Sequence, residues 1–207
     1  MHKLTNKFVS LFLSIVILLS ITFFMIHNIN YYDKKYQQYK VYDIFEQDVA
    51  LNATKSILGF FESDNELDSN FFKPDEVSHL QDVKDFLNIL RLILIVFLII
   101  VLFFLVFNFI QGNKIFDKLF FYTGTITISI FLFFGLIYFL LGFDFLFEAF
   151  HKIFFVENYA FDPRFSNMIL LFPNKFFQDF MFDIIIRTNI SAILMIVVGK
   201  IIKKKNI

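Results

Sequence analysis

The sequence predicts an all-α integral membrane protein with four transmembrane helices and an extracytoplasmic cap. Hydrophobic residues make up 57% of the 207-residue chain, and the mean hydropathy is +0.66, whereas soluble domains contain about 45–50% apolar residues. The excess lies in four long runs that do not alternate with period two. Helices are therefore preferred over strands, because each helix satisfies its own backbone hydrogen bonds in lipid.

The four runs are each long enough to cross a hydrocarbon core about 30 Å thick, which takes about 20 helical residues. They extend from Phe8 to Ile26, from about Leu90 to Ile110, from Leu119 to Phe143 and from about Phe180 to Ile202. The first run is followed by polar residues and lacks the small residues of a signal-peptide cleavage site. We therefore interpret it as an uncleaved signal-anchor helix.

The distribution of basic residues predicts the orientation of the chain. Segments on the cytoplasmic side of membrane proteins are enriched in Lys and Arg. With both termini placed in the cytoplasm, the cytoplasmic segments carry eight lysines and a single acid, Asp117. These lysines are Lys3, Lys7, Lys114, Lys118, Lys200, Lys203, Lys204 and Lys205. The opposite orientation would place the terminal lysine cluster outside.

This topology divides the chain into five regions. They are a cytoplasmic tail with the first span (1–27), an extracytoplasmic cap (28–89), the second and third spans with a short cytoplasmic loop (90–143), an aromatic-rich extracytoplasmic or interfacial segment (144–180), and the fourth span with a basic cytoplasmic tail (181–207).

The cap is expected to be largely helical. Tyr31 to Phe61 indicates helix or mixed structure, and Asn65 to Ser69 indicates a polar loop. Pro74 to Leu90 predicts a helix that continues into the second span. Candidates for its N-cap are side chains with a suitable oxygen acceptor, namely Asp75, Ser78 and Asp82.

The second outer segment is unusually aromatic. Residues 143–181 contain twelve Phe and one Tyr, which is not typical of a loop in water. We expect this segment to lie in the membrane interface, or to dip into the membrane where protein covers its backbone. Pro163 and Pro173 should break it into short pieces.

Two histidines are the main candidates for chemistry, because imidazole changes charge near neutral pH. The topology places His79 and His151 at similar depth, near the outer ends of spans. Asp82 shares a helical face with His79 and could orient its ring. The alternatives are an ordinary surface histidine at position 79, an interfacial anchor at position 151, or a metal site formed with Asp82, which no short ligand spacing supports.

Several classes of function lack their signatures. The chain has no Cys, which excludes a thiolate nucleophile and a disulfide framework. It also has no nucleophile elbow, Walker loop, Rossmann fingerprint or zinc-protease motif. No cofactor, metal or nucleic-acid partner is expected. A small transporter is a further alternative, but the polar residues of the third span alternate in sequence and so do not form one helical stripe.

Four segments resemble a known family. They are Val77 to Lys84, which contains His79, Phe150 to Phe155, which contains His151, Phe161 to Pro163, and Phe172 to Asp179. Together they are similar to signature stretches of a bacterial four-span family that includes the lipoprotein intramolecular transacylase. Relatives often carry Trp before the Asp-Pro pair, whereas this chain has Glu157 to Phe161 there. The departure concerns the shape of an acyl pocket and not the histidine pair.

The resemblance implies a reaction and its residues. An acyl chain would move from the sn-2 ester of a lipoprotein's diacylglyceryl group to the amine of its N-terminal Cys, giving a lyso-form lipoprotein. It implies that His79 and His151 are catalytic. The residues implied to support them or to bind substrate are Asp82, Lys84, Phe150, Phe154, Tyr159, Asp162 and Phe172. The implied partners are a diacylglyceryl lipoprotein and membrane lipid, at the outer face of a bacterial cell membrane.

Two imidazoles with pKa values near about 6.5 suit this chemistry. One can take the amine proton while the other protonates the leaving alkoxide, and the sequence leaves open which ring does which. The alternative is a non-enzymatic member of the same family that binds lipid or a protein partner.

Overall fold

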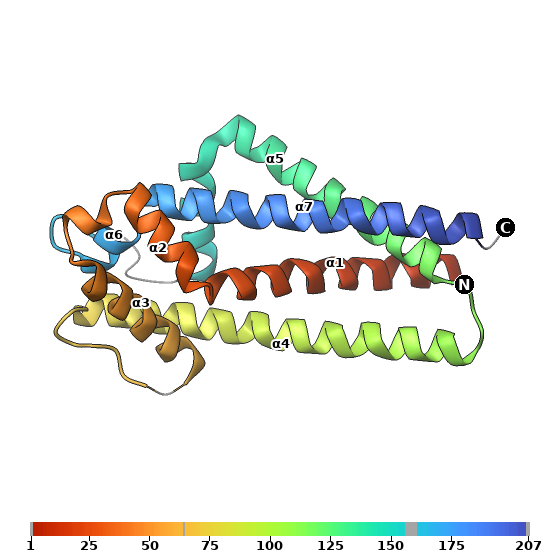
Figure 1. Cartoon of the computed structure of the whole chain (residues 1–207), viewed down its shortest axis with the longest axis horizontal. Helices are drawn as coiled ribbons and strands as arrows, with labels where there is room; N and C mark the ends of the chain where they lie inside the picture. Colours follow the sequence, from red (N-terminus) through yellow and green to blue (C-terminus); the bar gives the residue numbers. More distant parts are fainter. Residues whose placement is uncertain (1, 64, 156–160, 206–207) are drawn as a thin grey trace. The chain divides into compact units, whose positions relative to one another are not determined.

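The computed structural model describes residues 2–63, 65–155 and 161–205, and the regular structure within these ranges is helical (Figure 1). The elements are α1 (His2–Ile26), α2 (Ile29–Gln38), the 3-10 turn η1 (Val41–Asp43), α3 (Gln47–Glu62), α4 (Pro74–Ile110), α5 (Phe116–Phe154), α6 (Asn167–Leu171) and α7 (Asn174–Lys205). The predicted all-α class is confirmed.

Four helices, α1, α4, α5 and α7, are long and apolar enough to cross a membrane. The four predicted spans are therefore confirmed, and so is the prediction that the helix beginning at Pro74 continues into the second span. The 37 residues of α4 extend about 55 Å at 1.5 Å per residue. This exceeds a hydrocarbon core of about 30 Å, and the polar residues of α4 lie mainly in its first part.

The chain forms two compact units. The first consists of Met1–Thr22, Leu90–Leu140 and Asp183–Ile207, and the second of Phe23–Ile89 and Leu141–Phe182. The second unit includes residues 28–89 and the described part of residues 144–180, which are the two segments that the sequence places outside the membrane.

The first unit packs its helices through small and polar residues. The hydroxyl oxygens of Ser10 and Ser14 on α1 lie 3.2 Å from the backbone carbonyl oxygens of Leu119 and Thr123 on α5, and each hydroxyl hydrogen is shared with a carbonyl one turn back in α1, at 2.7 and 2.8 Å. A Cβ added at Gly124 would lie 2.3 Å from the carbonyl oxygen of Ala192, so the backbones of α5 and α7 approach closely at this glycine. Such contacts are typical of helices that associate within lipid.

The second unit is held together by aromatic packing. The Tyr32 ring of α2 stacks on the Phe176 ring of α7 with centroids 5.5 Å apart. A partly buried ion pair between Lys35 and Asp179 joins the same two helices. Rings packed in this way bury large apolar areas. In the second outer segment, Phe155, Phe172 and Phe176 are buried, whereas others such as Phe145 and Phe165 are exposed.

Helix α5 breaks at Gly142, where φ is +80° and ψ is 173°. L-residues rarely adopt this conformation, and glycine is the residue that tolerates it. The piece of α5 that follows the break carries Phe147, Phe150 and His151. Gly142 therefore sets the direction in which these side chains are presented.

The start of α4 corrects one expectation from the sequence. The helix begins at Pro74, and the backbone N–H of Lys73 donates to the Glu76 carboxylate at 2.8 Å. Glu76 therefore caps the helix, and the predicted candidates Asp75, Ser78 and Asp82 lie inside it. The prediction was wrong because it considered only Ser and Asp side chains, whereas the acceptor is a Glu in the first turn that reaches back to the N–H of the residue before the helix.

Candidate active site

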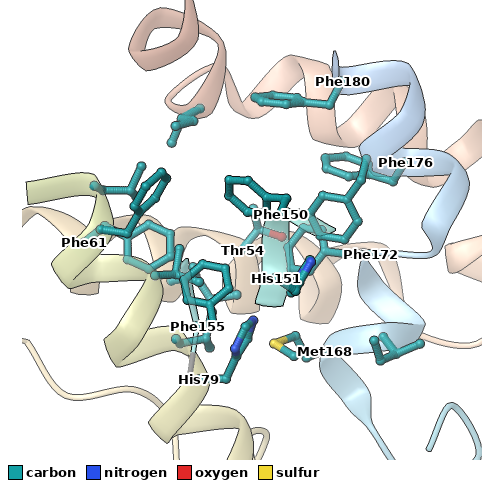
Figure 2. Close-up of a pocket in the computed structure, with 18 of the residues that line it drawn as sticks. Thr54, Phe61, His79, Phe150, His151, Phe155, Met168, Phe172, Phe176 and Phe180 are labelled. Carbon is teal, nitrogen blue, oxygen red and sulfur yellow. The ribbon is translucent and has the colours of Figure 1, made fainter. Parts of the chain in front are cut away.

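The second unit encloses a cavity of about 310 Å³ (Figure 2). Its walls are mainly phenylalanine rings, including Phe61, Phe86, Phe147, Phe150, Phe172 and Phe176. Polar groups are few, and His79 and His151 are two of them. An apolar pocket with a few convergent polar groups is the usual form of a ligand site.

His79 enters the cavity from the second turn of α4. Its side chain is buried, and its ring meets Phe155 and Phe161 edge-on, with centroids 5.1 and 5.6 Å away. Its Nδ1 atom is buried and has no hydrogen-bond partner among the residues that the structure describes. A buried polar atom without a partner is uncommon, and here it belongs to a ring that faces the cavity.

His151 enters from the last turns of α5. Its Nδ1 atom lies 2.7 Å from the carbonyl oxygen of Phe147. Because a carbonyl oxygen can only accept, Nδ1 carries the hydrogen in this bond. In the neutral ring the lone pair is then on Nε2, so the backbone of α5 selects the tautomer.

The two imidazoles converge, although they come from different helices (Figure 2). Their ring centroids are 6.0 Å apart and their planes differ by 17°. At this separation both rings can reach the atoms of one small reacting group. The arrangement can supply a base and an acid to the same reaction.

The aromatic residues predicted for the site fall into two groups. Phe150 and Phe172 line the cavity. Phe154 does not; it packs on Phe86 at a centroid distance of 4.7 Å and is about half exposed. The predicted Tyr159 lies outside the described residues.

The polar residues predicted for the site do not line the cavity. No hydrogen bond joins Asp82 to His79 within the described ranges, although its charge acts on that ring. The Lys84 ammonium group donates to the backbone carbonyl of Ser63 at 2.6 Å and lies over the Phe60 ring, so it ties α4 to α3. Asp162 pairs with Arg164, which lowers the pKa of the Asp162 carboxyl group.

One buried polar pair near the cavity was not predicted. The Tyr36 hydroxyl oxygen lies 2.6 Å from Oγ1 of Thr54, a cavity residue. Thr54 donates its single hydrogen to the carbonyl of Ala50, so Tyr36 is the donor. Burial raises the pKa of Tyr36 well above its usual range, which keeps the phenol neutral. The i, i+4 spacing of Tyr32 and Tyr36 was the signal that could have found this face.

No cluster of three or more potential metal ligands is found in residues 2–63, 65–155 and 161–205. The chemistry that the two converging imidazoles support is proton transfer.

Comparison with known proteins identifies the family. Residues 7–177 match the family model described as lipoprotein intramolecular transacylase Lit. The chain belongs to the Lit family. The matched region includes both histidines of the cavity and all the short helices of the second unit, so the whole candidate site lies in the part of the chain that carries the Lit pattern, apart from Phe180.

Solved structures of a Lit protein share this fold. The in meso structure of the membrane-integral lipoprotein intramolecular transacylase from Bacillus cereus has a TM-score of 0.86 and 19% identity, and the match covers 99% of this chain and 96% of that one. Structures of the same protein with one histidine replaced by arginine or by alanine have TM-scores of 0.77 and 0.78, also at 19% identity and with at least 95% of each chain covered. Among curated proteins, none matches the chain.

Proposed function

We propose that this protein is an intramolecular transacylase that converts a diacylated lipoprotein to its lyso form. The acyl chain moves from the sn-2 ester of the glyceryl group to the amine of the N-terminal Cys. The observation that carries the proposal is the pair of near-parallel imidazoles at an apolar cavity in a member of the Lit family. The cavity suits the acyl chain, and the imidazoles suit the proton transfers.

His151 is assigned as the base. The lone pair of its neutral ring is on Nε2, because Nδ1–H donates to the Phe147 carbonyl. As the amine nitrogen attacks the ester carbonyl carbon, Nε2 of His151 takes a proton from the amine, and a tetrahedral adduct forms. The C–N bond is made at this step, and the former carbonyl oxygen carries the negative charge.

His79 is assigned as the acid. When the adduct collapses, the bond between the acyl carbon and the sn-2 oxygen breaks, and His79 passes to that oxygen the proton that His151 took from the amine, which gives the free hydroxyl. One proton leaves the nitrogen and one reaches the oxygen, so the reaction needs no cofactor and no enzyme nucleophile. Both imidazoles are neutral again after this transfer, which restores the starting state.

Positioning supplies much of the rate in this mechanism. The ester and the amine belong to one molecule, but they must be brought together against the flexibility of the glyceryl and thioether chain. Holding two reacting groups in place can supply about 7–11 kcal/mol. The close-packed aromatic walls of the cavity are suited to this task.

The proposed location is a bacterial cell membrane, with both termini in the cytoplasm and the cavity at the extracytoplasmic face. The lysine distribution supports this orientation. The lipoprotein would then reach the cavity from the outer leaflet, with its peptide remaining in water and its acyl chains in lipid.

The direct test uses purified protein and a synthetic diacylated lipopeptide, with the products separated and sequenced by mass spectrometry. The wild type should form the N-acyl lyso product, and His79→Ala and His151→Ala should each lower the rate by about a hundredfold or more. His27→Ala is the matched control, since His27 pairs with Glu62 on an exposed surface and does not line the cavity.

Wild-type rates from both cavity variants would refute the proposed roles. An inactive wild type that still binds the lipopeptide would favour the alternative, a member of the Lit family that binds lipid or a protein partner without acyl transfer.

A further inference from the structure

Glu76 carries a carboxylate that is completely buried but does not line the cavity. It accepts three hydrogen bonds, from the backbone N–H of Lys73 at 2.8 Å, the hydroxyl of Ser166 at 2.5 Å and the backbone N–H of Met168 at 2.9 Å. A buried carboxylate is costly unless it is well bonded. This one is well bonded, and two of its three donors come from a distant part of the chain.

The carboxylate caps two helices at once. One oxygen accepts from Lys73, the residue before α4, as in a capping box. The other accepts from Met168, an N–H in the first turn of α6 that has no partner within that helix. Ser166 completes the cap by accepting from the backbone N–H of Ile169 at 3.2 Å.

Helix α6 depends on such contacts because it has only five residues, and helices this short are not stable on their own. A second tie supports the first, since the Asn167 side chain donates to the carbonyl of Phe71 at 2.7 Å. Both ties join α6 to the segment at the start of α4.

These ties lie next to the imidazole pair. His79 follows Glu76 by three residues, so the two are neighbours on one face of α4. Met168 and Ile169 of α6 line the same cavity as His79. Glu76 therefore connects the helical turn that presents His79 to the wall that α6 builds.

We propose that Glu76 is a positioning residue for the reaction, which acts by holding α6 against α4 so that the cavity wall keeps its place beside His79. The proposal rests on the proposed function for its catalytic consequence. Glu76 does not touch the cavity, so it acts through His79 and α6 and not by contact with substrate.

The test compares Glu76→Ala, Ser166→Ala and the double variant with the wild type and with Asp75→Ala. Asp75 is the matched control, because it is an exposed acid in the same turn of α4.

The first readout is the kinetics of lipopeptide conversion by full-length protein in detergent. Glu76→Ala should lower kcat by about tenfold or more and change KM by less than about twofold. The loss in the double variant should be smaller than the sum of the two single losses, since both changes break the hydrogen bond between Glu76 and Ser166 and only Ser166→Ala also removes the acceptor for the backbone N–H of Ile169.

The second readout is hydrogen exchange, which needs no activity. The amides of Met168 and Ile169 should exchange about tenfold faster or more in Glu76→Ala, whereas those of α1 should be unchanged. If Glu76→Ala fails to fold, Ser166→Ala carries the same two readouts, because it removes one of the three bonds and leaves the carboxylate two donors.

The outcomes separate the two proposals. A folded Glu76→Ala protein with wild-type kcat, or with unchanged protection of α6, would overturn the positioning role. Additive losses in the double variant would also overturn it. An inactive wild type would refute the proposed function, and the exchange measurement would still decide whether Glu76 holds α6.

Discussion

At the scale of single residues, a backbone carbonyl decides the chemistry of a side chain. The Phe147 carbonyl accepts from Nδ1–H of His151, so the lone pair of the neutral ring is on Nε2. His79 lacks such a partner among the described residues. Two identical side chains thus have different surroundings, which is the condition for giving them different roles in one reaction.

Tyr36 provides a test of the packing around the cavity. Tyr36→Phe removes the buried hydrogen bond to Thr54, and we expect it to lower the free energy of unfolding by about 1 kcal/mol. Thr54 keeps its own bond to Ala50, so the cost should not be larger. Thermal unfolding of the purified protein measures the change. In a cycle with Thr54→Val the two losses should not add; additive losses, or no loss from Tyr36→Phe, would contradict this contact.

Sequence reasoning could identify the two histidines of the candidate site, but it could not identify all the residues that surround them. The spacing of His79 and Asp82 predicts a shared helical face, yet the described residues show no hydrogen bond between them. Spacing fixes a face but not the direction of each side chain. Glu76 could not be found because its partners, Ser166 and Met168, lie about 90 residues away in the chain.

At the scale of elements, the break in α5 matters most for the site. Gly142 has φ +80° and ψ 173°, a conformation that is essentially confined to glycine and costs another residue about 1–3 kcal/mol. We expect Gly142→Ala to lower stability by about this amount and to slow lipopeptide conversion, because the piece of α5 that carries His151 would be presented differently.

Gly135 is the matched control for this prediction. It lies in the same helix, has helical geometry and has open space where a Cβ would be. Gly135→Ala should therefore be neutral or slightly stabilising. Equal effects of the two substitutions, measured by thermal unfolding and by rate, would show that the break at Gly142 has no special role.

The sequence predicted the elements with unequal success. The four spans and the continuity of α4 were found because length and apolar composition are local properties. The break at Gly142 was not, because a single glycine within an apolar run is compatible with an unbroken helix. Pro163 and Pro173 correctly predicted short pieces around α6, since proline interrupts helices.

At the scale of the whole molecule, the distribution of lysines predicts which side of the membrane each segment between spans occupies. The absence of Cys from the chain allows a clean test with single cysteines. Ser69→Cys should react with a membrane-impermeant maleimide in intact cells, and Lys118→Cys only after permeabilisation, because both side chains are exposed but belong to segments predicted on opposite sides. The reverse pattern would invert the proposed orientation.

The central claim is that the cavity joins two groups of one substrate molecule. The most direct measurement mixes two lipopeptides of different peptide sequence, only one of which has a deuterated sn-2 acyl chain, and analyses the products by mass spectrometry. We predict that the wild type converts both and that each N-acyl product keeps the acyl chain of its own precursor. Deuterium appearing on the other peptide, or no N-acyl product at all, would contradict the account.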